Sequence, residues 1–169
     1  MASWPEFRPT RLLGRLTAHG VDFVVVGGFA AIAHGSARLT RDLDVCYSPD
    51  AVNLEALGAA MVELGATLRG VEDDVPFVAD ARTLRATQVL TLDSEDGPID
   101  LLAAPAGGPG YAKLRQRAER VEIAGIPVLV ASLDDLLAMK RAAGRNKDLL
   151  DVEELETIRR LRKRIKPKI

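Results

Sequence analysis

The segment Asp42-Leu43-Asp44-Val45 places the strongest constraint on how this chain can fold. Successive side chains of a β-strand point to opposite faces, so Leu43 and Val45 share one face while Asp42 and Asp44 share the other. The apolar face needs a core to pack against, whereas two neighbouring carboxylates repel each other unless a cation lies between them. The sequence therefore predicts a sheet in which one strand opens its polar face onto a charged site.

A short buried strand is predicted ahead of this segment. Val21 to Val26 is an apolar run rich in branched residues that stops at Gly27 and Gly28, and such runs are typical of strands covered on both faces. The alanine-rich stretch 29–34 is expected to form a short helix. Glycines between a strand and a helix let backbone N–H groups approach phosphate oxygens, but they fit a simple tight turn equally well.

The remaining pattern predicts strands and helices in irregular alternation. Leucine spacing indicates helices over Thr10 to His19 and Ala51 to Leu64, whereas residues 66–86 show no clear period. The other expected elements are hairpin arms over Gln88 to Leu92 and Ile99 to Ala103, a loop over Ala106 to Gly110, a helix over Tyr111 to Arg120, a hairpin over Val121 to Val130, a helix capped by Ser132 and closed by Gly144, and a final helix over Asn146 to Ile165.

These elements favour an α/β (α+β) fold with a mixed sheet flanked by helices and with further helices at the C-terminus. We expect a single domain over residues 1–169, with its core at about 10–130 and a helical part at about 131–169. The apolar runs are too short to cross a bilayer, so no membrane association and a cytoplasmic location are expected.

Cysteine and histidine usage excludes two classes of site. Cys46 is the only cysteine, which leaves no internal disulfide and no cysteine-rich zinc site. The two histidines, His19 and His34, do not stand in a ligand spacing. Cys46 is therefore expected to be a small core side chain.

The net charge of -1 hides an uneven distribution of charged residues. Seven basic residues and no acidic ones occupy 159–169: Arg159, Arg160, Arg162, Lys163, Arg164, Lys166 and Lys168. Such a cluster can bind nucleic acid by displacing counterions from phosphates, or it can be a solvated helix end that complements the helix dipole. The acidic run Glu72-Asp73-Asp74 is open to two interpretations, a pocket for a cationic acceptor or a solvated loop.

A third carboxylate strengthens the case for a metal site. Asp100 lies inside the predicted arm Ile99 to Ala103, next to the strand of Asp42 and Asp44. Magnesium prefers oxygen ligands and often takes only a few carboxylates together with substrate phosphates, and three carboxylates suit displacement at phosphorus. We expect one or two Mg²⁺ ions, with Mn²⁺ as an alternative.

Lys140 is the clearest candidate among the cations. Leu133, Leu136 and Leu137 form the apolar stripe of its predicted helix, and position 140 falls on the same stripe. A lysine there either extends its ammonium out to solvent or reaches a partner such as a nucleotide phosphate.

Four segments in order resemble one known superfamily. They are Val25-Val26-Gly27-Gly28-Phe29-Ala30, the run from His34-Gly35-Ser36 to Asp42-Leu43-Asp44-Val45, Pro98-Ile99-Asp100-Leu101-Leu102, and the run from Lys140 to Asp151 that contains Lys147-Asp148-Leu149-Leu150-Asp151. Together, over residues 21–155, they resemble the nucleotidyltransferases of the branch that contains the AbiEii abortive-infection toxins and the MenT-type toxins. The resemblance implies transfer of a nucleoside monophosphate from a nucleoside triphosphate (NTP) to an acceptor, with release of pyrophosphate.

The resemblance also implies roles for individual residues. Asp42, Asp44 and Asp100 are the expected catalytic residues and metal ligands, with Asp100 either holding a second ion or taking a proton from the attacking hydroxyl. The expected substrate-binding residues are Gly27, Gly28, Ser36, Arg38, Lys140, Arg145 and Lys147. Asp148 and Asp151 either orient Lys147 or Arg145 or form surface ion pairs, and Arg41, like Arg38, either serves the substrate or offsets the acidic cluster.

The acceptor is the open part of the prediction. The basic C-terminus favours RNA, for example the end of a transfer RNA, and the resemblance implies a toxin with a cognate antitoxin. The alternatives are nucleotidylation of a small molecule, as by antibiotic-modifying transferases, nucleotidylation of a protein, and a non-catalytic nucleotide-binding module. Only about twenty residues follow Asp151, so the sequence specifies acceptor recognition only weakly.

Overall fold

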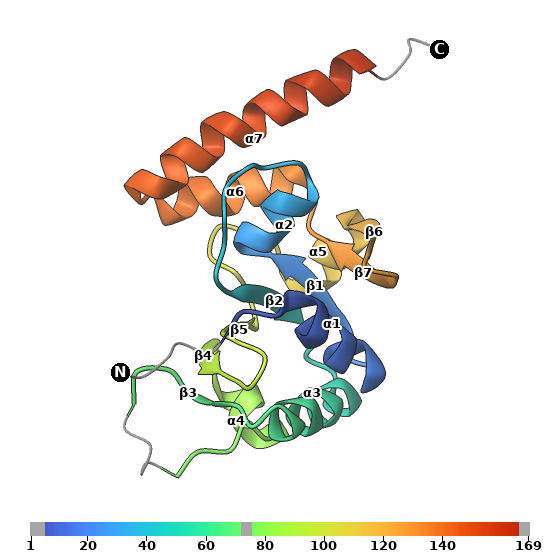
Figure 1. Cartoon of the computed structure of the whole chain (residues 1–169), viewed down its shortest axis with the longest axis vertical. Helices are drawn as coiled ribbons and strands as arrows, with labels where there is room; N and C mark the ends of the chain where they lie inside the picture. Colours follow the sequence, from blue (N-terminus) through green and yellow to red (C-terminus); the bar gives the residue numbers. More distant parts are fainter. Residues whose placement is uncertain (1–5, 72–75, 166–169) are drawn as a thin grey trace.

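A mixed β-sheet forms the centre of the fold in the computed structural model, which describes residues 6–71 and 76–165. In the described residues its order is β3-β4-β5-β2-β1-β7-β6 (Figure 1). The strands are β1 (Phe23–Val26), β2 (Leu43–Tyr47), β3 (Thr67–Leu68), β4 (Val89–Asp93), β5 (Ile99–Leu102), β6 (Glu119–Ile123) and β7 (Ile126–Val130). The helices are α1 (Pro9–Ala18), α2 (Gly27–Ala33), α3 (Ala51–Glu63), α4 (Ala81–Ala86), α5 (Tyr111–Arg117), α6 (Leu133–Ala143) and α7 (Asn146–Ile165). The predicted fold class is confirmed.

The pairing of the central strands determines where the acidic residues lie. β2 pairs antiparallel with β1 and parallel with β5. In this register Asp44 stands opposite Val26 on one side and opposite Asp100 on the other. Directly opposed residues on adjacent strands point to the same face of a sheet, so Asp44 and Asp100 share one face.

The other face of β2 belongs to the core. Leu43 and Val45 are fully buried, as the alternation predicted. The leucines of α1 (Leu12, Leu13 and Leu16) and the apolar stripe of α3 are buried in the same cluster. Burial of a leucine contributes roughly 1.5–3 kcal/mol, so this core fixes the strand and thereby holds its carboxylates on the opposite face.

Several element boundaries differ from the prediction by one to three residues; β1, for example, begins at Phe23 where the strand was expected from Val21. The helix after β1 begins at Gly27, two residues earlier than expected, so both glycines belong to its first turn. α5 ends at Arg117 and β6 starts at Glu119, whereas the prediction extended the helix to Arg120. The Ala124-Gly125 turn, with both residues at positive φ, sets a hairpin register that pairs Glu119 with Val130, and this pairing extends the strand at the expense of the helix.

The region without a clear pattern, 66–86, contains β3 and α4. The acidic run Glu72-Asp73-Asp74 lies outside the described residues.

The chain ends in a helical hairpin. The Ser132 side chain accepts a hydrogen bond from the Asp135 amide at the start of α6, and Gly144, with a φ of 61°, closes the helix, as predicted. α7 packs along α6 but is 20 residues long against 11, so its C-terminal part extends past α6 (Figure 1). No helix in the described part of the chain is both long and apolar enough to span a membrane.

Candidate active site

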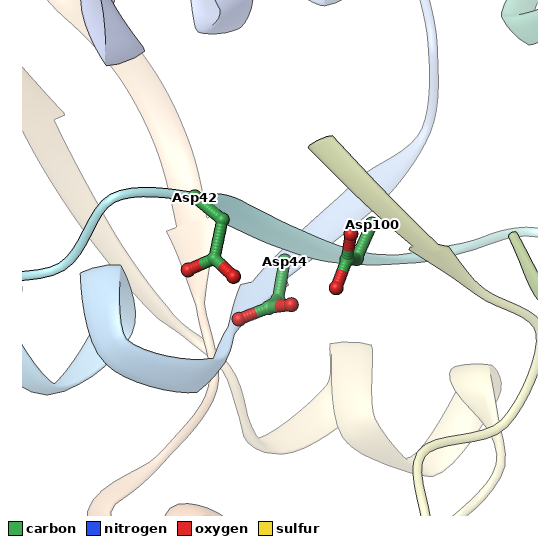
Figure 2. A group of neighbouring side chains, drawn as sticks. All are labelled: Asp42, Asp44 and Asp100. Atoms are coloured by element: carbon green, nitrogen blue, oxygen red, sulfur yellow. The ribbon is translucent and has the colours of Figure 1, made fainter. Parts of the chain in front are cut away.

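Three carboxylates converge at the polar face of β2 and β5. Asp42, Asp44 and Asp100 each offer an oxygen, and these oxygens all lie within 4.8 Å of one another (Figure 2). Burial, followed by the charges of Asp42 and Asp100, raises the pKa of Asp44 to about 7, against a weaker opposite effect of Lys140. Clustered, partly buried carboxylates are unfavourable by themselves, and the all-oxygen donor set fits a divalent cation such as Mg²⁺.

Two neighbours that were not predicted contact this cluster. Thr40 donates a hydrogen bond of 2.9 Å to Asp42 Oδ1. The Arg69 guanidinium lies 2.8 Å from Asp100 Oδ1. Burial raises the pKa of Asp100, and Arg69 opposes that shift. Thr40 lies two residues before Asp42, but Arg69 lies in the stretch without a clear pattern, so no sequence signal identified it.

A cavity of ≈ 260 Å³ opens over the carboxylates. All seven residues predicted to bind substrate line it: Gly27, Gly28, Ser36, Arg38, Lys140, Arg145 and Lys147. Asp42, Asp44, Asp100 and Asp151 line it as well. Arg41 is exposed and is not among the lining residues. The structure therefore brings three parts of the chain, 27–44, Asp100 and 140–151, together around one cavity.

The two glycines make room for the acidic strand. A Cβ at Gly27 would lie 2.0 Å from Asp44 Oδ2, and the φ of Gly27 is 67°. A Cβ at Gly28 would lie 2.9 Å from Thr40 Oγ1. Any larger residue at position 27 would displace Asp44, so the glycine has a steric role in addition to any contact with a phosphate.

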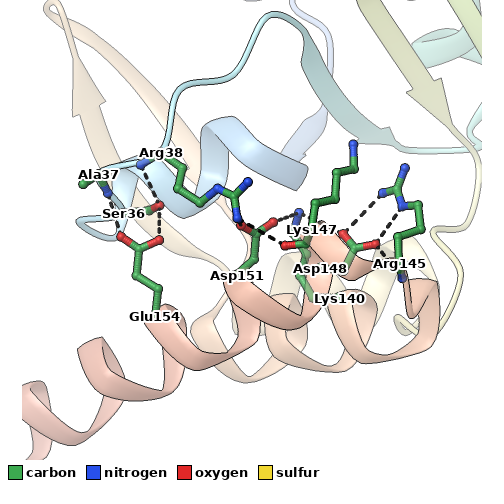
Figure 3. Close-up of polar contacts among 9 residues, drawn as sticks. All are labelled: Ser36, Ala37, Arg38, Lys140, Arg145, Lys147, Asp148, Asp151 and Glu154. Atoms are coloured by element: carbon green, nitrogen blue, oxygen red, sulfur yellow. Dashed lines mark hydrogen bonds and ion pairs between the residues drawn. The ribbon is translucent and has the colours of Figure 1, made fainter.

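Carboxylates of α7 hold the cations of the cavity (Figure 3). Lys140 Nζ lies 2.9 Å from Asp151 and 3.5 Å from Asp148. Asp148 also pairs with Arg145 at 2.7 Å, and Asp151 pairs with Arg38 at 2.9 Å. Burial opposes ionisation of Asp148, but the hydrogen bonds from Arg145 outweigh it and lower the pKa of this carboxyl. Lys140 thus has its partners within the protein and is only 14% exposed.

Glu154 adds a contact that sequence reasoning missed. It accepts hydrogen bonds of 2.8 Å from the Ser36 hydroxyl and from the Ala37 amide. Glu154 follows Asp151 by three residues, so the two carboxylates lie on one face of α7, and that spacing is the signal that could have identified it. Ser36, predicted to bind substrate, therefore donates its hydroxyl hydrogen bond to a carboxylate of the chain itself.

Lys147 differs from the other cations. It lines the cavity, but in residues 6–71 and 76–165 no carboxylate pairs with its ammonium, and Figure 3 shows the side chain extending away from α7. Asp148 and Asp151 thus contact Lys140, Arg145 and Arg38, but not Lys147.

A second, apolar cavity of ≈ 180 Å³ adjoins the first. The two share Gly27, Asp44, Lys140 and Arg145 as lining residues. The other walls are mostly apolar and come from the ends of β1 and β5, the loop after β5, α6 and α7: Val26, Leu102, Pro105, Ala106, Leu136, Met139, Ala143 and Asp148. The site thus has a charged half and an apolar half on either side of Asp44.

Comparison with known families identifies this arrangement. The sequence model described as "Nucleotidyl transferase AbiEii toxin, Type IV TA system" matches residues 11–166. The chain belongs to the AbiEii family. This AbiEii-family member is accordingly a nucleotidyltransferase with a nucleotide substrate, and the family's type IV toxin–antitoxin systems imply an antitoxin partner.

Solved structures support the fold of this AbiEii-family chain. The antibiotic-resistance factor ANT(2'')-Ia is similar with a TM-score of 0.55 and 17% identity over 92% of this chain and 89% of that one. The lincosamide antibiotic adenylyltransferase LnuA gives a TM-score of 0.59 and 16% identity over 88% and 94%. An antigenic nucleotidyltransferase-like protein from Paracoccidioides brasiliensis gives 0.50 and 18% over 90% and 73%. A search of curated proteins found no match.

Proposed function

We propose that this nucleotidyltransferase uses Mg²⁺ held by Asp42, Asp44 and Asp100 to transfer a nucleoside monophosphate from an NTP to RNA. The observation that carries the proposal is the placement of these three carboxylates in one cavity with Lys140, Arg145 and Lys147. Carboxylates for a metal beside cations for phosphates are the combination that phosphoryl-type transfer requires.

Each half of the site takes one part of the nucleotide in this proposal. Bound Mg²⁺ supplies positive charge that offsets the charge of the triphosphate during displacement. Lys147 contacts the phosphates directly, because its ammonium has no carboxylate partner in the described part of the chain. The apolar cavity beside Asp44 accommodates the nucleoside, because bases and sugars bind against apolar walls.

The cationic end of α7 supports an RNA acceptor. Arg160, Lys163 and Arg164 are exposed. Arg159 and Arg162 pair with Asp134 and Glu119, but both are surface pairs, which contribute little. Lys166 and Lys168 lie outside the described residues. A helix end of this kind can track a phosphate backbone and displace its counterions. We also propose that an antitoxin of the same system restrains this activity.

A small-molecule acceptor is the second candidate. ANT(2'')-Ia and LnuA, which share this fold, are an antibiotic-resistance factor and a lincosamide antibiotic adenylyltransferase. At 16–17% identity they show the fold alone, and the acidic run that could hold a cationic acceptor, Glu72-Asp73-Asp74, lies outside the described residues. RNA remains the preferred acceptor because the exposed cations of α7 attract polyanions.

The test is label transfer from each of the four NTPs, with Mg²⁺ and total cellular RNA, followed together with pyrophosphate release. The Asp44→Asn variant is expected to lose transfer, and Glu55→Gln, which changes an exposed carboxylate on α3, is expected to retain it. Pyrophosphate release without labelled RNA would reject the RNA acceptor. Equal transfer by Asp44→Asn would reject the site itself.

A further inference from the structure

We propose that Arg69 is a positioning residue for Asp100, and that it determines which oxygen of this carboxylate faces the cation. The proposal rests on the cation site of the proposed function. The Arg69 guanidinium lies 2.8 Å from Asp100 Oδ1. The contact is an ion pair without hydrogen-bond alignment, so Arg69 supplies a charge held at a fixed position beside this oxygen.

Arg69 is itself fixed from the neighbouring strand. Its backbone amide donates to the Thr91 carbonyl at 3.0 Å. Its guanidinium donates to the Leu92 carbonyl at 2.8 Å and to Asp93 Oδ1 at 3.1 Å. A planar fork with several fixed partners has lost most of its rotational freedom before it contacts Asp100. The side chain can therefore impose a geometry on the carboxylate.

The exposure of Asp100 shows which oxygen remains available. Oδ1 is buried, yet the side chain as a whole is 17% exposed, so Oδ2 is the oxygen that opens to the cavity. Thr91, Asp100 and Asp44 are direct cross-strand neighbours on β4, β5 and β2. Figure 2 shows Asp100 with one oxygen turned toward Asp44. Arg69 on Oδ1 thus leaves Oδ2 to share a cation with Asp44.

A purely electrostatic role for Arg69 predicts the opposite result on mutation. A positive charge next to a cation site repels the cation, so removing it would tighten metal binding. Loss of a residue that orients a metal ligand weakens metal binding, typically 10–100-fold. The sign of the change in metal affinity therefore separates the two roles.

The experiment measures Mn²⁺ binding to the full chain by electron paramagnetic resonance, without nucleotide or acceptor. Arg69→Met is expected to weaken Mn²⁺ binding about tenfold or more. Arg69→Lys, which keeps the charge but loses the fork, is expected to bind more weakly than wild type. Arg85→Met removes an exposed arginine of α4 and is expected to change nothing. Unchanged or tighter binding by Arg69→Met overturns the proposal; if that variant does not fold, wild-type affinity in Arg69→Lys overturns it.

A second pair of variants tests whether Arg69 acts through Asp100. In an Asp100→Asn background, adding Arg69→Met is expected to reduce Mn²⁺ affinity less than about twofold, because the two effects are coupled. A full additional tenfold loss overturns the proposal. Failure of wild type to bind Mn²⁺ rejects both this inference and the metal in the proposed function. Binding of Mn²⁺ without transfer to RNA rejects only the acceptor.

Discussion

The Ser36 hydroxyl donates a hydrogen bond of 2.8 Å to the carboxylate of Glu154, 118 residues further along the chain. The same carboxylate accepts a hydrogen bond from the Ala37 amide. Through these contacts α7 occupies two donors at the edge of the cavity that a phosphate oxygen could otherwise use. The NTP and Glu154 therefore compete for the same groups if the triphosphate reaches Ser36.

Removing Glu154 is expected to improve NTP binding. Hydrogen bonds to charged groups contribute roughly 1.5–3 kcal/mol, and part of this is lost when a phosphate displaces the carboxylate. Glu154→Ala should lower KM for the NTP roughly 3–10-fold with little change in kcat, a factor of ten corresponding to about 1.4 kcal/mol. Steady-state pyrophosphate release measures both constants. Glu153→Gln, an exposed neighbour on α7, is the control, and a higher KM in Glu154→Ala would show that the contact builds the site instead.

Gly27→Ala is expected to abolish activity by displacing Asp44. The new Cβ would lie 2.0 Å from Asp44 Oδ2, and the positive φ adds a backbone cost of roughly 1–3 kcal/mol. Gly20 is the matched control, since it has the same φ of 67° but nothing within 4 Å of an added Cβ. Thermal unfolding should show a similar loss of stability in both variants. Mn²⁺ binding should be lost only in Gly27→Ala. Loss of metal in both would remove the steric explanation.

We expect Lys140 to contribute mainly to stability and Lys147 mainly to substrate binding. Lys140→Met leaves Asp151 and the fully buried Asp148 with fewer partners. The free energy of unfolding should fall by about 1–3 kcal/mol, because Arg145 still contacts Asp148. Lys147→Met should change stability by less than about 0.5 kcal/mol but raise KM for the NTP at least about fivefold. Denaturant unfolding and KM measurements on both variants check this. The reverse pattern would mean that Lys140, not Lys147, is the main phosphate contact.

The pKa of Asp44 predicts how stability depends on pH in metal-free protein. Its folded-state pKa of about 7 lies above the unfolded value of roughly 3.9. The protonated form therefore stabilises the fold below the unfolded pKa, and this contribution is lost as pH rises through about 7. With EDTA at pH 8, Asp44→Asn should unfold at least about 2–4 °C higher than wild type, with little difference at pH 4. Mg²⁺ should raise the Tm of wild type at pH 8 and not that of the variant; parallel curves at both pH values would contradict the prediction.

The cations of α7 distinguish the two acceptor classes. Arg160, Lys163 and Arg164 are exposed, so changing all three to glutamine should leave stability nearly unchanged. RNA binding should weaken, and the slope of log K against log salt should fall by up to about 3. Pyrophosphate release that depends only on NTP and metal should be retained. Undiminished RNA binding by the triple variant would place the RNA elsewhere and favour a small-molecule acceptor.

Local sequence patterns determined most elements of this fold, though not β3 and α4, and the chemistry of its carboxylates. The alternation at Asp42 to Val45 placed the two acids on one side of the chain, although β2 begins only at Leu43 and Asp42 directly precedes it. The leucine spacing of α1 and α3 matched their buried sides. Ser132 and Gly144 marked the ends of α6 correctly. These signals depend on neighbours within a few residues, where helix and strand periods apply directly.

Only the tertiary structure decided which residues meet. Arg69, which no pattern identified, contacts Asp100 because β3 lies beside β4 and β4 beside β5. Glu154 contacts Ser36 because α7 folds back along α6. The sequence placed Lys140 on an apolar stripe, but its pairing with Asp151 depends on the same helical hairpin. Contacts between residues far apart in sequence follow from strand order and helix packing, which no local period encodes. These contacts determine which cationic side chains pair with carboxylates of the chain and which oxygen of Asp100 is exposed.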